Sequence, residues 1–184
     1  MKNIADFLFE ARILKDVVRS GYAFLGSGRE TIAEHSYMTA LICFVMARLD
    51  PDVDSTRLLS MALLHDIPEA RTGDLNYVEK NYCQKDENKA VSHLTRKLPF
   101  GPDIESIMDE FNAAETKEAK LVHDADQLAF ILELKKLMDT GNKGPEKWLP
   151  NVCKRLCTET GKKMADAILS TGWDEWWLND YKEE

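Results

Sequence analysis

Hydrophobic residues recur mainly at spacings of three and four along the chain, which is the period of an amphipathic α-helix. The pattern begins with five apolar residues at this spacing, Phe7, Leu8, Ala11, Leu14 and Val18. No segment alternates hydrophobic and polar residues convincingly enough to predict a β-strand. The pattern therefore predicts an all-α protein that folds as a compact orthogonal helical bundle.

Proline and glycine residues divide this pattern into separate helices. The expected helices cover residues 33–49, 56–65, 85–97, 104–111, 116–139 and 150–169. Asp54 or Ser55 is placed to cap the second of them, and residues 68–74 are expected to form a turn-rich connection. We interpret residues 1–184 as one domain, with a core of about residues 11–139 and a C-terminal helical extension of about residues 146–184.

Composition narrows the classes of partner. The chain has 32 acidic residues against 24 Lys and Arg, a net charge of −8, which disfavours a nucleic-acid polymer as partner. A small phosphorylated substrate remains compatible with this charge. The longest apolar run, residues 40–47, is too short to cross a membrane, and the charged N-terminal segment does not resemble a signal peptide. We expect a cytoplasmic protein.

The cysteines show no spacing typical of a disulfide framework. Cys43 lies inside an apolar run, where a buried reduced thiol is the expected form. Cys153 and Cys157 are one helical turn apart, but no further Cys or His lies nearby to complete a zinc site. The cysteines therefore predict no metal site.

Aromatic residues are concentrated near the C-terminus, where Trp173, Trp176, Trp177 and Tyr181 follow helical spacing. Docking of this stripe onto the core is the default interpretation, and a homodimer surface is the alternative. The sequence does not decide between the two.

Two expected helices carry histidines at buried positions. His35 shares a stripe with Met38, Ile42, Val45 and Leu49, which predicts that this face of helix 33–49 points into the core. His65 and Asp66 follow an almost wholly apolar helix. Polar groups at these positions would be costly to bury without partners.

A carboxylate on the long helix 116–139 completes the set. Asp126 lies beside Val122 and Phe130 at helical spacing, so its side chain should face inward. Asp124 points about 200° away on an ideal helix, and we expect it to be solvated. His123 stands one turn before Asp126 and could hydrogen-bond to the site.

These residues suggest a shared cation. A single buried histidine usually has a hydrogen-bonded structural role. Two histidines and two aspartates on the apolar faces of three helices are more simply explained by one bound divalent metal. Mixed nitrogen and oxygen donors suit Mn, Fe, Co, Ni or Zn, and four protein ligands leave positions open for water and a substrate oxygen.

Four segments resemble the HD-domain metal-dependent phosphohydrolases, most closely the branch of 5′-deoxynucleotidases. They are residues 32–36 (IAEHS), 62–70 (ALLHDIPEA), 72–75 (TGDL) and 123–128 (HDADQL). The segments occur in the family's order, and the resemblance spans about residues 11–136. It implies that the metal ligands are His35, His65, Asp66 and Asp126.

The resemblance also implies roles around the metal. It makes Glu69 and Asp74 catalytic acids beside the ligands, and it places Arg19 where the family has an arginine that grips the phosphate. From the residues alone, Glu69 could also be an exposed turn carboxylate, Asp74 a turn or cap residue, and Arg19 a surface charge.

The expected substrate contacts are Arg19, Tyr22, Asp74, Tyr77 and Lys80. Tyr22 stands near Arg19, where the family often has tryptophan, and Asn76-Tyr77 stands where it often has proline. Lys80 is an alternative phosphate ligand to Arg19. These departures leave the preferred nucleotide open.

The function implied is a phosphomonoesterase that uses a metal-activated water to hydrolyse the 5′-phosphate of a (deoxy)nucleoside monophosphate. One alternative is another HD-type reaction, on a cyclic nucleotide, a nucleoside triphosphate or an alarmone. A non-catalytic HD scaffold is the other alternative, and the intact set of ligands and acids counts against it.

Overall fold

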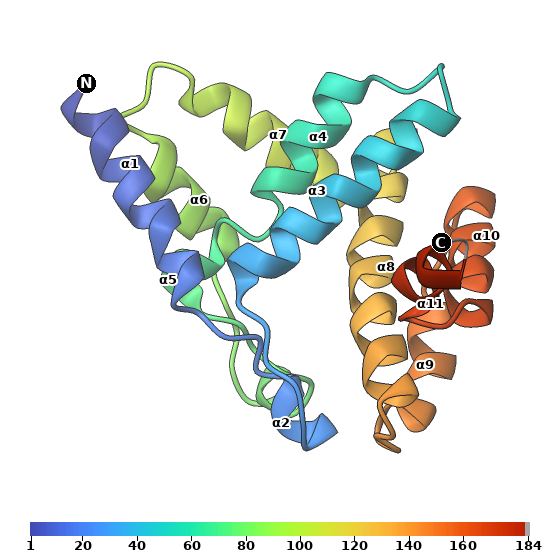
Figure 1. The fold of residues 1–184 in the computed structure, drawn as a ribbon. Coiled ribbons are helices and arrows are strands. Elements are labelled where there is room, and N and C mark those ends of the chain that lie inside the picture. The colour runs from blue at the N-terminus through green and yellow to red at the C-terminus, as the bar shows by residue number, and fades with distance from the viewer. Residues whose placement is uncertain (183–184) are drawn as a thin grey trace.

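Three helices form the centre of the molecule, α3 (Ile32–Leu49), α4 (Ser55–Leu64) and α8 (Lys117–Asp139). The structure is a computed structural model that describes residues 1–182. α1 (Lys2–Arg12) and α6 (Glu87–Thr95) lie on one side of this centre, and α9 (Pro145–Cys153) and α10 (Glu159–Ser170) lie on the other side, along α8 (Figure 1). The described residues contain no β-strand, only an isolated bridge between Val18 and Thr31. The prediction of an all-α helical bundle is confirmed.

Shorter elements connect and flank these helices. The remaining α-helices are α2 (Tyr22–Leu25), α5 (Glu69–Thr72), α7 (Gly101–Ala113), α9 (Pro145–Cys153), α10 (Glu159–Ser170) and α11 (Glu175–Leu178). The 3₁₀ turns are η1 (Ile13–Lys15), η2 (Glu79–Asn81) and η3 (Asp180–Lys182). α5 lies within the segment predicted to be a turn-rich connection. Within residues 1–182, no helix combines the length and the hydrophobicity needed to cross a membrane.

Local capping sets where the central helices begin. Thr31 and Glu34 form a capping box at the start of α3, which places His35 at the end of its first turn. Asp54 accepts a hydrogen bond from the Arg57 backbone N–H at 2.9 Å and so caps α4. Thr116 caps α8 in the same way. These caps fix the register of the helices that supply the site.

Two hydrophobic cores meet along α3. The larger core packs α3, α4 and α8 around a set of fully buried side chains that includes Met46, Leu58, Met61, Leu128 and Ile131. The smaller core joins α1, α6 and α7 and includes Ile32. His35 lies between Ile32 of one core and Ile42 of the other, so the packing holds its imidazole at their junction.

The predicted apolar stripe of α3 is wrong at its C-terminal end. Val45 is 39% exposed and Leu49 is 65% exposed, whereas Cys43 and Met46 are fully buried. The buried face of α3 centres on Thr39, and at about 100° per residue Val45 lies roughly 120° away from it. The expectation that Cys43 is a buried free thiol is confirmed.

The predicted single helix over residues 150–169 is also wrong. α9 ends at Cys153, and α10 begins at Glu159 with Thr158 as its N-cap. Asp124 holds the turn between them, because it accepts hydrogen bonds from the backbone N–H groups of Cys157 and Thr158, both at 2.8 Å. Asp124 is therefore fully buried, which contradicts its predicted solvation. It points away from Asp126 as expected, but α10 covers that side of α8.

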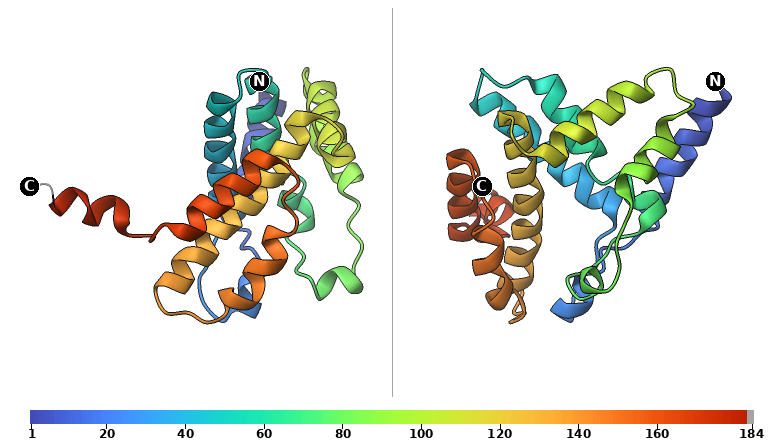
Figure 2. Two further views of the ribbon diagram at one scale, coloured as in Figure 1. Left: turned by 90° about the vertical axis from the view of Figure 1, so that its right-hand side faces the viewer. Right: turned by 180° about the vertical axis from the view of Figure 1, so that it is seen from behind.

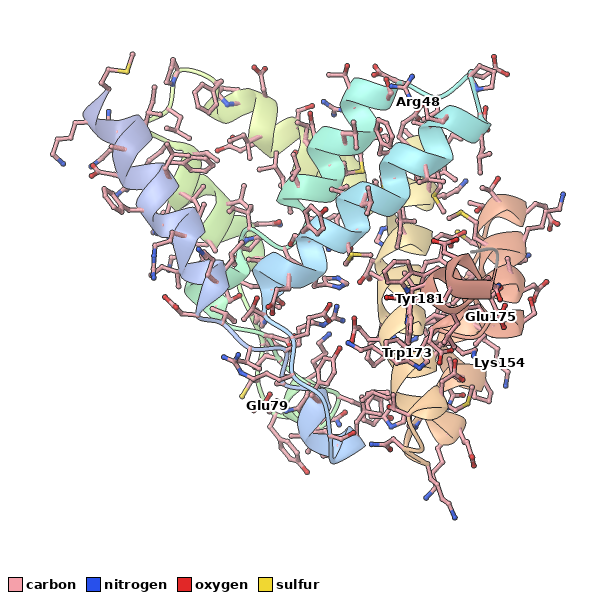
Figure 3. The ribbon with its side chains drawn as sticks, viewed as in Figure 1. Arg48, Glu79, Lys154, Trp173, Glu175 and Tyr181 are labelled. Carbon is pink, nitrogen blue, oxygen red and sulfur yellow. The ribbon has the colours of Figure 1, made fainter. Side chains whose placement is uncertain are left out.

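The aromatic stripe near the C-terminus does not dock fully onto the core. Trp176 and Tyr181 are largely exposed, and Trp173 and Trp177 are partly exposed. α11 extends away from the helical body in the left view of Figure 2, and Figure 3 shows Trp173 and Tyr181 on this segment. Core docking is thus wrong for most of the stripe, and the homodimer surface stays a prediction.

Candidate active site

Three side chains converge where α3, α4 and α8 meet. His35 comes from the first turn of α3, His65 from the end of α4, and Asp126 from the middle of α8. One donor atom of each lies within 4.8 Å of the other two. His35 Nε2 is 2.8 Å from Asp126 Oδ1, and the two imidazole centroids are 5.6 Å apart. These three residues could hold one divalent metal.

Asp66 stands at the edge of this group. Its Oδ2 lies 3.2 Å from His65 Nε2 and 3.8 Å from His35 Nε2. The structure thus brings together all four residues predicted as ligands, although Asp66 is not among the three that lie mutually within reach. Its role as a fourth ligand stays a prediction.

Unpaired ring nitrogens test whether a cation fits. The Nδ1 atom of His65 lies 2.8 Å from the Ala62 carbonyl oxygen. Because a carbonyl only accepts, Nδ1 carries a hydrogen, and Nε2 is the atom that can bind a metal once it has lost its own proton. The Nε2 atoms of His35 and His65 are both buried. Each lies beside a carboxylate of the same cluster, Asp126 and Asp66 respectively, but neither makes a hydrogen bond of normal geometry among the described residues. A shared divalent cation would satisfy them, so the donor set fits a metal.

The surroundings of the cluster shift the pKa of each possible ligand. Burial alone would raise the pKa of Asp126, but His35 and Arg19 hold it well below its usual range. Burial and the nearby Arg19 lower the pKa of His35. Burial would also lower the pKa of His65, but Asp66 and Asp126 raise it to about 9. Ionised carboxylates and neutral imidazoles are the forms that bind metals, so binding at His65 should release a proton.

Glu69 lies beside the cluster with its two carboxylate oxygens in different surroundings. Oε1 is 3.1 Å from Lys85 Nζ, and Oε2 is buried without a hydrogen-bond partner in residues 1–182. Burial, together with the charges of Asp66 and Asp74, raises the pKa of Glu69 to about 8 against the effect of Lys85. The alternative of an exposed turn carboxylate is therefore wrong. A carboxyl group that titrates near neutral pH is suited to proton transfer.

Asp74 connects two loops at the site. Its Oδ2 accepts hydrogen bonds from the Ser20 backbone N–H at 2.6 Å and from the Ser20 hydroxyl at 2.9 Å. Lys85 Nζ also donates to the Gly73 carbonyl oxygen. These contacts tie the segment after α5 to the loop that carries Arg19.

Arg19 is held on two sides. Its guanidinium lies 5.4 Å from the Phe130 ring centroid, and Nη1 is 3.6 Å from Glu30 Oε2. Tyr22 is buried, and its hydroxyl donates to the same Glu30 oxygen at 3.1 Å. Nη1 of Arg19 is buried and has no hydrogen-bond partner among the described residues. Arg19 is therefore not a plain surface charge, and its Nη1 has hydrogen-bonding capacity that Glu30 does not satisfy.

The remaining predicted residues make no hydrogen bond or ion pair with the cluster among the residues that the structure describes. Tyr77 is largely exposed, and Lys80 is an exposed residue of η2 that makes no ion pair in the described part of the chain. His123 is engaged elsewhere, since its Nε2 lies 2.9 Å from the Phe111 carbonyl oxygen and its ring stacks on Phe111. His123 supports the packing next to His65 and is not in the group of potential ligands.

Sequence reasoning missed Lys85, Glu30 and Phe130. Lys85 stands at the start of a charged segment, and nothing in its spacing distinguishes it from its exposed neighbours. Glu30 precedes the capping Thr31, a position where a buried carboxylate has no sequence signal. The spacing of Phe130 places it in the core but does not place it beneath a guanidinium. Each role depends on a contact between distant parts of the chain.

Comparison with known proteins identifies the family. A model of the HD domain matches residues 11–168. The 5′-deoxynucleotidase HDDC2 of Bos taurus is 28% identical over 148 residues, 77% of this chain and 71% of the relative. The 5′-deoxynucleotidase hdd1 of Schizosaccharomyces pombe is 30% identical and covers 72% of this chain and 71% of its own length.

Solved structures show the same fold. A predicted metal-dependent phosphohydrolase from Magnetospirillum magnetotacticum superposes with a TM-score of 0.73 at 25% identity, over 98% of this chain and 96% of the other. A conserved hypothetical protein from Pyrococcus furiosus superposes with a TM-score of 0.76 at 27% identity, over 89% and 96%. The chain therefore belongs to the HD-domain family. Its fold and its histidine–aspartate cluster define a metal-dependent phosphohydrolase.

Proposed function

We propose that the protein is a phosphomonoesterase that hydrolyses the 5′-phosphate of (deoxy)nucleoside monophosphates to nucleoside and phosphate. One observation carries the proposal: the guanidinium of Arg19 is buried beside the cluster, and its Nη1 makes no hydrogen bond in the described residues although Glu30 lies 3.6 Å away. The charges of Asp126, Glu30 and Asp66 raise its pKa despite burial. A positive donor beside a metal-ligand cluster suits a phosphate that contacts both. The relatives named as 5′-deoxynucleotidases support the choice of substrate.

The side chains divide the chemistry among them. A divalent cation held by His35, His65 and Asp126 would supply Lewis acidity for activating water and polarising the phosphoryl group. Arg19 would hold two phosphate oxygens, which fixes the phosphorus in line with the attack. Glu69 would accept the proton of the attacking water on its unpaired Oε2.

Two further groups keep this arrangement in place. Lys85 holds the other oxygen of Glu69, so only Oε2 is free to take a proton. Asp74 binds Ser20, the residue after Arg19, and so limits where the guanidinium can move. The net charge of −8 should also disfavour highly charged substrates over a monophosphate.

Phosphate release from a panel of substrates tests the proposal. The panel contains deoxynucleoside and ribonucleoside 5′-monophosphates, a nucleoside triphosphate and a cyclic nucleotide. We expect release from monophosphates that EDTA abolishes and Mn²⁺, Co²⁺ or Zn²⁺ restores, with none from His35→Ala. Hydrolysis only of the triphosphate or the cyclic nucleotide, or full activity in a chelated sample, would contradict the proposal.

A further inference from the structure

A cleft of about 600 Å³ opens between α9 and the loop that follows the TGDL segment. One wall consists of Phe24, Tyr77 and Val78, and the other includes Trp148, Asn151 and Arg155. Figure 3 shows Glu79, which follows Val78, on the side of α2, and Lys154, at the end of α9, on the side of α10. None of the residues that line the cleft belongs to the four motif segments of the HD family.

Two chains of contacts connect this cleft to the phosphate and metal groups. The Phe130 ring lies under Arg19 at 5.4 Å and meets the Trp148 ring edge-on at 5.9 Å between centroids. Gln127 donates to Asp126 Oδ2 at 2.8 Å and accepts from Arg155 Nη1 at 3.4 Å. The cleft therefore begins one side chain beyond both Arg19 and Asp126, next to the groups proposed to hold the phosphate and the metal.

The lining of the cleft is suited to a flat heterocycle. Phe24 and Tyr77 expose aromatic surface in a concave site, and base–aromatic stacking is a general means of holding nucleobases. Asn151 is exposed and offers both a donor and an acceptor, as needed to read the edge of a base. Lys147 and Arg155 add positive charge to the same wall.

We infer that this cleft binds the base of the nucleotide, with Tyr77 stacking on it and Asn151 determining which base is preferred. The inference rests on the proposed function and extends it from the phosphate to the rest of the substrate. It assigns base specificity and catalysis to different elements. α9 and the loop would contact the base, whereas α3, α4 and α8 supply the potential metal ligands.

Two variants and a matched control test the inference. Tyr77→Ala and Asn151→Ala change exposed side chains of the cleft, and Tyr82→Ala changes an 85% exposed tyrosine nearby that does not line it. Trp148 is left intact because it packs on Phe130. For each protein, kcat/KM is measured with deoxynucleoside monophosphates and with deoxyribose 5-phosphate, which has no base.

We expect Tyr77→Ala to lower the ratio of these two kcat/KM values about tenfold, in keeping with the loss of one stacking contact. Asn151→Ala should change the ranking of the four bases, and Tyr82→Ala should behave as the wild type. An unchanged ratio and ranking in both cleft variants would overturn the inference. Equal losses on both substrates would also overturn it, because base binding cannot affect a substrate without a base.

Binding of unphosphorylated deoxynucleosides, measured by calorimetry, separates this inference from the proposed function. If no monophosphate is hydrolysed but nucleosides bind in a Tyr77-dependent way, the cleft assignment stands and the proposed function falls. If monophosphates are hydrolysed and neither nucleoside binding nor the kcat/KM ratio depends on Tyr77, the proposed function stands and the cleft assignment falls. Absence of both hydrolysis and nucleoside binding would overturn both.

Discussion

Glu69 lies beside the cluster but is not among the three residues that could hold a metal together. Its Oε1 is occupied by Lys85, and its Oε2 is buried without a partner in the described residues. Glu69→Gln should therefore keep the metal but lower kcat by about 100-fold, the size typical of a lost proton-transfer group. Metal content by mass spectrometry and kcat for a monophosphate measure the two effects.

The exposed Glu87→Gln on α6 serves as the matched control and should change neither quantity. If metal content falls in step with kcat in Glu69→Gln, Glu69 is a ligand and the proton-transfer role is wrong.

Glu30, the buried carboxylate beside Arg19, should make the free energy of unfolding depend on pH. Burial raises the pKa of Glu30 to about 7, an effect that Glu133 strengthens and that Arg19 and Tyr22 oppose. The folded protein therefore binds more protons at Glu30 than the unfolded chain does between about pH 4.5 and pH 7. Because the folded state is the more protonated one, the contribution of Glu30 to the free energy of unfolding falls as pH rises through this window.

Urea unfolding of wild type and Glu30→Gln at pH 5 and pH 8 measures this effect. We expect the stability of the wild type relative to the variant to fall by up to about 3 kcal/mol from pH 5 to pH 8. The exposed Glu159→Gln should show no such dependence. A difference between wild type and Glu30→Gln that is constant with pH would mean that Glu30 has an ordinary pKa.

At the scale of elements, Asp124 decides where the C-terminal helices begin and end. Its carboxylate accepts four hydrogen bonds, from the backbone N–H groups of Cys157 and Thr158, from the Cys157 thiol and from the Thr158 hydroxyl. Gly161 allows this close approach, because a Cβ there would collide with the Asp124 carboxylate. α9 and α10 are thereby tied to α8.

Asp124→Ala should lower the free energy of unfolding by about 3 kcal/mol, because it leaves buried donors unsatisfied at the start of α10. Urea denaturation monitored by circular dichroism measures the change. Asp166→Ala, at an exposed position of α10, should have little effect. Equal stability of Asp124→Ala and wild type would show that the turn does not depend on this carboxylate.

At the scale of the whole molecule, a metal would join helices that are far apart in the sequence. Its potential ligands come from α3, α4 and α8, so only the folded chain presents them together. A cation at about 100 times its Kd should then stabilise the protein by about 2.7 kcal/mol, which raises Tm by about 5–10 °C for a chain of this size.

Thermal unfolding with EDTA, and again after adding Mn²⁺ or Zn²⁺, measures this shift. Wild type should lose and regain the difference, whereas His35→Ala should have the same Tm in both conditions. A wild-type Tm that does not respond to either treatment would contradict metal binding at this cluster.

The elements that the sequence determined are those encoded by interactions over a few residues. Apolar spacing, together with the cap expected at Asp54 or Ser55, predicts α3, α4 and α8 to within a few residues. The same spacing turns His35 and Asp126 inward, so the sequence alone is enough to name both as candidate metal ligands. These features depend on local backbone geometry, which the sequence specifies directly.

What only the tertiary structure decided is which element covers each face. Helical spacing turns Asp124 away from Asp126 but cannot show that α10 packs there, nor that the end of α3 leaves Val45 and Leu49 exposed. Lys85 reaches Glu69 across 16 residues, and Ser20 binds Asp74 across 54. Burial and side-chain pairing depend on contacts between distant segments, so they exist only once the helices have packed. The shifted pKa of Glu69 and the fixed position of Arg19 result from those contacts.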